Sequence, residues 1–404
     1  MTSFREWLDW WRGSPPLSEE EFTAQYADLI AAAPIPTLWL LGKTGSGKSS
    51  VVRFFTQADA VEIGSGFRPQ TTCSSRYDFP DAAEPLVTFL DTRGLGEAGY
   101  DPTEDIAKFS ESTQLILVTV RVMDHALEEL VDQLRTIRKS APERPVALLL
   151  TCLHQAYPGE DHPEVDPFPV DGGALLTELP PGLPENLFRS LQAQRQRFAG
   201  LVDAIVPIDL TPAAEGFLTA EFGGERLRAT VLQQLPQAYR QNLLQMEEVI
   251  KDLKDQLQRK TWSTILAASS LAGTAAAVPL PWVDIPVVMA IQTHLAYRLA
   301  AIYDQQLTAT TWAQMTGAAG GRIAIRMALR EFLKVIPWVG MAANAAAAFA
   351  YTYASGMAWD WYFTEIRKGH VPQARELEQV FKDQLARGAT LWSRTAVEPK
   401  ERGK

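Results

Sequence analysis

The residues best suited to chemistry lie in the stretch GKTGSGKSS, at positions 42–50. They fit the pattern G-x-x-x-x-G-K-[ST], with an apolar run before it and a helix-compatible segment after it. Glycines in such a loop let backbone N–H groups turn inward around phosphate oxygens, and the positive end of the following helix faces the same anion. The sequence therefore predicts a phosphate-binding loop of nine residues: Gly42, Lys43, Thr44, Gly45, Ser46, Gly47, Lys48, Ser49 and Ser50.

Two side chains of this loop and one later carboxylate have distinct predicted roles. Lys48 is expected to bridge the outer phosphates, and the Ser49 hydroxyl is expected to ligate Mg²⁺. Asp91 ends the apolar run in PLVTFLD, and Gly94 follows three residues later. In proteins with this loop, such an aspartate holds Mg²⁺ and the glycine N–H contacts the γ-phosphate. The spacing favours a nucleoside-triphosphate site, although a turn at a strand end would also explain it.

The elements that position these residues follow from an alternation along residues 37–211. Short apolar runs (TLWLL, PLVTFLD, QLILVTV, PVALLLT and AIVPIDL) alternate with helix-length segments such as Met123 to Ser140 and Glu185 to Gly200. This alternation predicts an α/β domain at 37–224, a doubly wound and mostly parallel sheet with helices on both faces. An irregular insertion at 152–184 is rich in proline, glycine and acidic residues, which predicts a long surface loop near the nucleotide base.

The remainder of the chain is expected to be helical. Residues 1–36 form an N-terminal helical extension, 225–260 a charged connecting helix, and 261–404 an all-α domain. Two segments of that domain, Thr261 to Val283 and Val335 to Trp359, carry no charge and are rich in alanine. Helices of this length suit either a closely packed helical domain or insertion in a membrane, and the sequence leaves both alternatives open.

Composition excludes some classes of protein. The chain has 404 residues, 46% of them hydrophobic, so it can bury two or three cores. Its net charge of -10 argues against a general nucleic-acid binder, and no DNA partner is expected. Cys73 and Cys152 are its two cysteines, which suits a reducing compartment and predicts a cytoplasmic protein.

Three segments together resemble a known family. GKTGSGKSS, RPQTTCSSRYDFP and FLDTRGLGE look like the first three motifs of an Era-like GTPase of the translation-factor-related class. The resemblance implies GTP as substrate and Mg²⁺ as cofactor, with Ser49, Thr72 and Asp91 at the metal. It also implies that Lys48, Thr72 and Gly94 serve hydrolysis. Leu95 stands where a Ras-like switch carries glutamine, which implies slow intrinsic turnover.

The fourth motif departs from the family. The family places N-K-x-D after the strand that corresponds to VALLLT, and here Thr151 to His154 read TCLH. Thr151 and His154 are therefore the expected nucleotide-base contacts, yet a neutral imidazole accepts only one hydrogen bond where a carboxylate accepts two. Asp209, Leu210 and Thr211 are candidates for the base-stacking loop by position. An ATPase or a nucleotide-binding module of relaxed specificity is thus the alternative to a GTPase.

The C-terminal half resembles a YcjF-type domain of unknown function over about Trp262 to Phe363. This resemblance implies contact with a membrane surface or the inner membrane, and related switches often form homodimers. Contact with RNA or the ribosome is implied only by the family resemblance. The leading hypothesis is a slow GTPase switch that couples nucleotide state to the helical domain. A further alternative is a membrane or scaffold protein that scarcely hydrolyses nucleotide.

Overall fold

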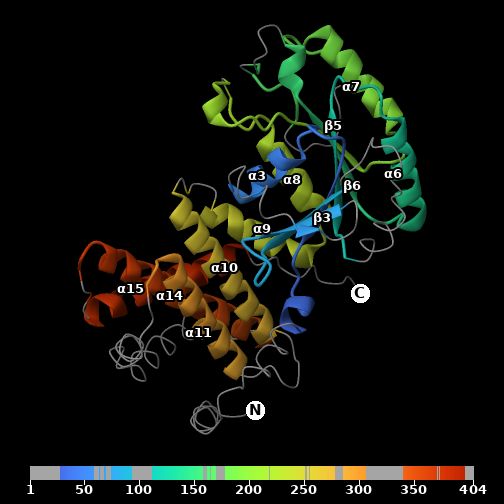
Figure 1. Cartoon of the computed structure of the whole chain (residues 1–404). Coiled ribbons are helices and arrows are strands. Elements are labelled where there is room, and N and C mark those ends of the chain that lie inside the picture. The colour runs from blue at the N-terminus through green and yellow to red at the C-terminus, as the bar shows by residue number, and fades with distance from the viewer. Residues whose placement is uncertain are drawn as a thin grey trace. The chain divides into compact units, whose positions relative to one another are not determined.

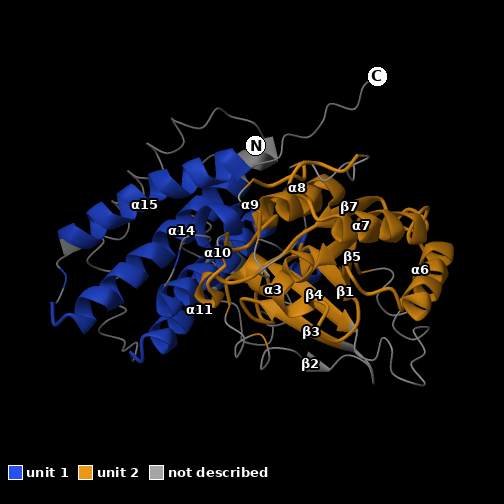
Figure 2. Cartoon of the chain, turned by 90° about the horizontal axis from the view of Figure 1, so that it is seen from above, with its two compact units in different colours: residues 1–34, 244–404 blue, residues 35–243 orange. Residues whose placement is uncertain are grey.

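The computed structural model divides the chain into two compact units, coloured separately in Figure 2. The sheet unit comprises residues 35–243, and the helical unit comprises residues 1–34 and 244–404. The structure describes residues 28–58, 63, 68–69, 74–92, 112–157, 162–163, 165–169, 178–217, 219–250, 253, 255–277, 285–305, 340–370, 372 and 374–395.

The sheet unit contains a seven-stranded sheet in the order β2-β3-β4-β1-β5-β6-β7. Strand β1 pairs in parallel with β4 and β5, and the parallel pairing continues through β6 to β7. Strands β2 and β3 complete one edge in antiparallel pairing. The predicted doubly wound, mostly parallel sheet is therefore confirmed. The strands are Thr37–Leu41 (β1), Arg68–Pro69 (β2), Ser74–Phe79 (β3), Val87–Thr92 (β4), Leu115–Arg121 (β5), Val146–Thr151 (β6) and Ala204–Pro207 (β7).

Helices cover both faces of this sheet (Figure 1). On one face, Trp39 and Leu41 of β1 share a buried apolar cluster with residues of helices α6 and α7. On the other, Phe55 of helix α3 lies 6.4 Å from Phe89 of β4, ring centre to ring centre. Strands buried on both faces need apolar side chains at every position, which is why they appear in the sequence as continuous apolar runs. The helices are Lys48–Thr56 (α3), Glu128–Ser140 (α6), Glu185–Arg197 (α7) and Gly224–Gln234 (α8), with 3₁₀ turns Leu153–Ala156 (η1) and Ala213–Glu215 (η2).

Three local expectations differ from the structure. Helix α6 begins at Glu128, not at Met123, because residues 124–126 form a turn that binds the phosphate loop. The antiparallel strand β3 has no counterpart among the predicted runs, since Arg76 and Asp78 interrupt its apolar side chains. The expected single connecting helix at 225–260 is divided among α8, α9 (Gln237–Ile250) and the start of α10. Pro236 lies at the first break, and proline cannot continue a helical hydrogen-bond ladder.

The helical unit is built from α10 (Gln256–Ala277), α11 (Ile285–Ile302), α14 (Gly340–Arg367) and α15 (Ala374–Thr395), together with the end of α9. Small residues let its helices approach closely: a Cβ added at Gly388 of α15 would lie 3.1 Å from the Ala350 Cα of α14. A half-buried carboxylate, Asp360 of α14, accepts hydrogen bonds from the Tyr303 hydroxyl and from Trp262 Nε1 at 3.1 Å. Among the helices described, none is both long enough and apolar enough to cross a membrane.

Candidate phosphate-binding site

The predicted phosphate loop connects β1 to α3, and the structure shows how its backbone turns. Gly47 adopts φ = 101° immediately before the first residue of α3, a left-handed conformation that suits glycine. The Ser46 N–H donates to the Lys43 carbonyl at 3.1 Å, which closes a tight turn. The N-terminus of α3 and the loop amides therefore occupy the arrangement that binds anions in proteins.

Strand β5 forms the floor under this loop. A Cβ added at Gly42 would lie 2.4 Å from both the backbone oxygen and the hydroxyl of Thr119, so only glycine allows the loop to approach so closely. The Ser46 and Thr119 hydroxyl oxygens are 2.6 Å apart and hydrogen bonded. Because both side chains are buried, this contact fixes the height of the loop above the sheet.

The ends of β5 and β6 hold the carbonyl groups of the loop. Arg121 Nε donates to the Gly45 carbonyl at 2.9 Å, and the Thr151 hydroxyl donates to the Ser46 carbonyl at 2.8 Å. Thr151 was predicted to contact the nucleotide, and the structure places its side chain against the loop. Its effect on a bound nucleotide would therefore be exerted through the position of Ser46.

Lys48 and Asp91, which are far apart in the sequence, come together at this site. Lys48 Nζ donates to the carbonyls of Gly42 at 2.7 Å and Lys43 at 3.2 Å, so the ammonium group lies within the curve of the loop. Asp91 lies one residue before the end of β4, and its Oδ1 is 3.7 Å from Lys48 Nζ. Ser49, in the first turn of α3, is exposed beside them. The predicted lysine, hydroxyl and carboxylate thus share one end of the sheet.

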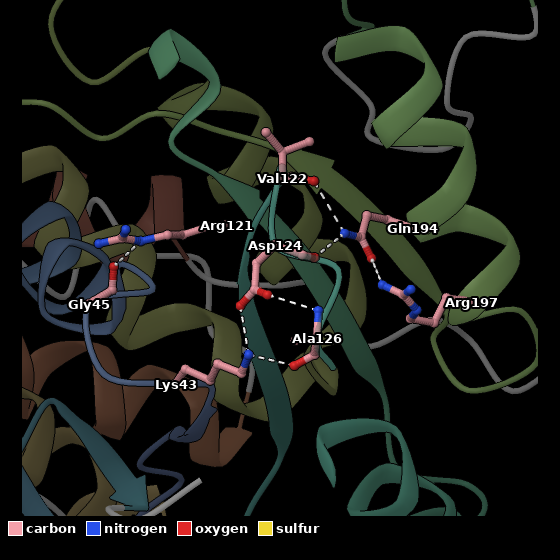
Figure 3. A network of polar contacts seen from close by, with 8 residues as sticks. All are labelled: Lys43, Gly45, Arg121, Val122, Asp124, Ala126, Gln194 and Arg197. Carbon is pink, nitrogen blue, oxygen red and sulfur yellow. Dashed lines mark hydrogen bonds and ion pairs between the residues drawn. The ribbon is translucent and has the colours of Figure 1, made fainter. Parts of the chain in front are cut away.

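A second polar network binds the side of the loop (Figure 3). Lys43 Nζ lies 2.9 Å from Asp124 Oδ2 and also donates to the Ala126 carbonyl. Burial opposes ionisation of Asp124, but hydrogen bonds from Lys43 and the Ala126 N–H together bring the pKa of its carboxyl below the ordinary value. Gln194 of α7 donates to the Asp124 carbonyl at 2.7 Å. The Lys43 ammonium is therefore directed toward this turn, and only the backbone of Lys43 is placed to face a phosphate.

His154, which was predicted to contact the nucleotide base, lies in the turn after β6. Its backbone N–H donates to Asp209 Oδ2 at 2.8 Å, and its Nδ1 lies 2.7 Å from the same oxygen. Asp209 follows β7, so the two residues extend from the carboxyl ends of neighbouring parallel strands. Burial, with a further contribution from the Asp209 charge, raises the pKa of the Cys152 thiol nearby. Because His154 Nδ1 contacts Asp209, the protein itself already engages one ring nitrogen of His154.

Sequence reasoning did not find several of these residues. Thr119, Arg121 and Asp124 belong to no motif, and they reach the loop only because β5 pairs beside β1. The one signal in the sequence that could have indicated them is that polar residues follow the apolar run LILV. Two predicted catalytic or metal residues, Thr72 and Gly94, lie outside the described residues, as does Leu95.

A glycine loop between a strand and a helix, a lysine within it and an aspartate at the end of the neighbouring parallel strand define a P-loop nucleotide-binding domain. Residues 37–152 match the model of the family described as 50S ribosome-binding GTPase. The sheet unit therefore carries a GTPase-type domain. No curated protein matches the chain.

Solved structures with some likeness to the chain include three GTPases. The LeoA bacterial dynamin GTPase from ETEC is 11% identical with a TM-score of 0.37, and the match covers 94% of this chain and 93% of that one. Toc33 from Arabidopsis thaliana, in complex with Mg²⁺ and GMPPNP, is 18% identical with a TM-score of 0.29, covering 55% and 96%. A single-residue variant of S. thermophilus NFeoB bound to GDP.AlF4⁻ is 12% identical with a TM-score of 0.28, covering 88% and 99%. Since every one of these scores is below 0.5, the assignment rests on the family match and the site geometry.

Proposed function

We propose that the protein is a slow GTPase switch, in which the nucleotide bound to the sheet unit controls the helical unit. The observation that carries the proposal is the meeting of Lys48 and Asp91, with a nitrogen to oxygen distance of 3.7 Å, at the mouth of a loop whose domain matches a GTPase family. The loop amides would bind the phosphates, and the Lys48 ammonium would exchange its carbonyl partners for phosphate oxygens.

The residues present fit a magnesium ion. Mg²⁺ prefers hard oxygen ligands, and it usually takes one or two protein groups and keeps several waters. The Ser49 hydroxyl and the Asp91 carboxylate supply such oxygens beside the loop. Thr72 would join them by the family resemblance. When bound, the ion would neutralise charge that develops on the phosphate oxygens during transfer.

Slow turnover is proposed because Leu95 replaces the glutamine of Ras-like switches. An aliphatic side chain cannot orient an attacking water by hydrogen bonding. The coupling is proposed through covalent continuity, because α9 begins in the sheet unit and ends in the helical unit. In such switches, contacts with the γ-phosphate usually order particular segments of the chain, and hydrolysis releases those segments. The same proposal includes the Era-like subtype of the GTPase domain and a YcjF-type helical unit. It also includes a cytoplasmic location, homodimer formation and contact with a membrane surface.

The central test is binding of fluorescent mant-GTP to the full chain. Lys48→Ala should remove both binding and phosphate release, because the Lys48 ammonium lies within the curve of the loop, whereas the Lys43 ammonium pairs with Asp124 at its side. Lys139→Ala, an exposed lysine in the last turn of α6, is the matched control and should bind as the wild type does. Wild-type affinity in the Lys48 variant would refute the assignment.

Relaxed base specificity is the second candidate, and the His154 geometry favours it. Asp209 already engages one ring nitrogen of His154, so one nitrogen at most is left for a base, where an N-K-x-D carboxylate would accept two hydrogen bonds. Excess ATP should then displace labelled mant-GTP. Failure of ATP to compete would show that guanine is selected by other groups, and would leave the GTPase proposal standing.

The third candidate binds nucleotide without turnover, as a scaffold. Its test is multiple-turnover phosphate release from GTP with and without liposomes. No release in either condition, together with retained mant-GTP binding, would favour the scaffold over the switch.

A further inference from the structure

Two histidines and one aspartate converge beyond the carboxyl ends of β6 and β7 in the sheet unit. One potential ligand atom from each of His154, His162 and Asp209 lies within 4.8 Å of the others. Asp209 Oδ2 is 2.7 Å from His154 Nδ1 and 3.2 Å from His162 Nε2. His154 lies in the 3₁₀ turn η1, His162 lies further along the insertion at 152–184, and Asp209 lies in the loop after β7. The cluster therefore joins three separate segments of the chain.

The hydrogen bonds of His162 determine which of its ring nitrogens faces the cluster. Nδ1 lies 2.7 Å from the Thr219 carbonyl, which can only accept, so Nδ1 carries a proton and donates it. In a neutral imidazole Nε2 then presents its lone pair. That lone pair faces the Asp209 carboxylate, which is also an acceptor. Two acceptors 3.2 Å apart in a buried site require a cation between them, either a proton or a metal ion.

The surroundings of His162 are those of a metal ligand. A ligating histidine commonly donates its other ring N–H to a backbone carbonyl, which fixes the tautomer and the ring orientation. The His162 ring is also stacked between Phe217 and Phe222, with ring centres 4.9 and 5.0 Å away. The Asp209 N–H donates to the Phe222 carbonyl at 2.8 Å, which ties the carboxylate to the same loop. The ligand atoms are thus positioned before any ion binds.

The donor set selects the class of metal. Two imidazole nitrogens and one carboxylate oxygen suit Zn²⁺, which takes three protein ligands and an open fourth position at many sites. The His162 side chain is fully buried and the Asp209 side chain is 5% exposed, while the His154 side chain is 17% exposed. The cluster is therefore accessible from the His154 side, where an ion could enter and a fourth ligand could bind.

We propose that His154, His162 and Asp209 bind one transition-metal ion of the Zn²⁺ class, which pins together the loops beside the nucleotide base. This site is separate from the Lys48, Ser49 and Asp91 group that would serve phosphate and Mg²⁺. It does not depend on the proposed GTPase activity.

The test is Zn²⁺ titration of the tag-free full chain after its metal has been stripped. The wild type should bind one Zn²⁺ per chain with calorimetric saturation, and Zn²⁺ should raise the melting temperature because it binds the folded state. Asp209→Asn keeps a hydrogen-bond acceptor for the His154 N–H, and His162→Phe keeps an aromatic ring between Phe217 and Phe222. Each should weaken Zn²⁺ binding by at least about 10- to 100-fold, the loss seen when only the outer shell of a site is altered.

The matched control is His370→Ala, which removes a histidine whose Nε2 is 3.6 Å from a Glu376 oxygen in the helical unit. This variant should keep wild-type Zn²⁺ affinity. X-ray absorption of the zinc-loaded wild type should show nitrogen and oxygen ligands with two imidazoles, a readout that does not rely on a variant that folds.

Each opposite outcome overturns the proposal. No Zn²⁺ binding by the wild type would mean that the cluster shares a proton, and equal binding by Asp209→Asn and His162→Phe would place the ion elsewhere. Sulfur ligation would assign the zinc to a cysteine. Since nucleotide is absent from all of these measurements, a failed mant-GTP assay would not affect them.

Discussion

The fit of Gly42 over strand β5 makes one substitution especially informative. In Gly42→Ala, the new Cβ would be 2.4 Å from the Thr119 backbone oxygen and 2.4 Å from its hydroxyl, and 2.6 Å from the Ser46 hydroxyl. The backbone oxygen belongs to strand β5, where Thr119 pairs with Leu149 of β6, so it cannot rotate away as a side chain would. The loop itself must move by about 1 Å to restore ordinary van der Waals contact.

That displacement sets the expected magnitude. A misplacement of about 1 Å in a group that positions a substrate can cost about 100-fold. We therefore expect the mant-GTP dissociation constant to rise by about 100-fold in Gly42→Ala. Overpacking a well-packed site costs about 1–3 kcal/mol, so the melting temperature should fall as well.

Gly200→Ala is the control that separates the effect of backbone strain from the effect of a steric clash. Gly200 has φ = 74°, so alanine is strained there too, but its Cβ would meet nothing within 4 Å. It should lose about 1–2 kcal/mol of stability and keep its nucleotide affinity. The reasoning would be refuted if Gly42→Ala bound mant-GTP as tightly as Gly200→Ala does.

Two further predictions concern hydrogen bonds. Thr151→Val removes the hydroxyl that donates to the Ser46 carbonyl, which should cost about 1–3 kcal/mol of stability. The variant should also bind mant-GTP more weakly in a fluorescence titration. Unchanged affinity would show that Thr151 does not position the loop. In the helical unit, burial raises the pKa of Asp360 above its ordinary value of 3.8, although the hydrogen bonds from Tyr303 and Trp262 oppose the shift. The stability gained from protonation is complete below the ordinary pKa and is lost as pH rises through the raised one. As pH rises from acid to neutral, the melting temperature of the wild type should therefore fall relative to that of Asp360→Asn. If the two melting temperatures changed with pH in the same way, the raised pKa of Asp360 would be contradicted.

The sheet could be predicted from sequence because most of its strands are buried on both faces. Strands such as β1 and β6 are continuous apolar runs, which are typical of parallel strands buried on both faces. Strand β3 was missed because its buried residues, Ser75, Tyr77 and Phe79, alternate with Arg76 and Asp78, which are less buried. That half-polar alternation is typical of an antiparallel strand, and the two charges obscured it.

The candidate site could be predicted only where its residues are contiguous in the sequence. The loop from Gly42 to Ser50 is contiguous, so its chemistry is visible in one stretch of sequence. The contact of Arg121 with the loop depends on strand register, which pairs Leu41 with Val118, and no local pattern records register. His162 is subject to the same limit, because it meets Asp209 only through the fold of two loops.

The order of the chain has a consequence for biosynthesis. The sheet unit is continuous from Ile35 to Leu243, whereas the helical unit includes residues from both sides of it. Domains generally fold as units during synthesis, the earlier ones first. A nascent chain that has just passed Leu243 already contains every strand of the sheet and all of the loop residues. The residues of the candidate phosphate site can therefore come together before the ribosome has made helices α10, α11, α14 and α15.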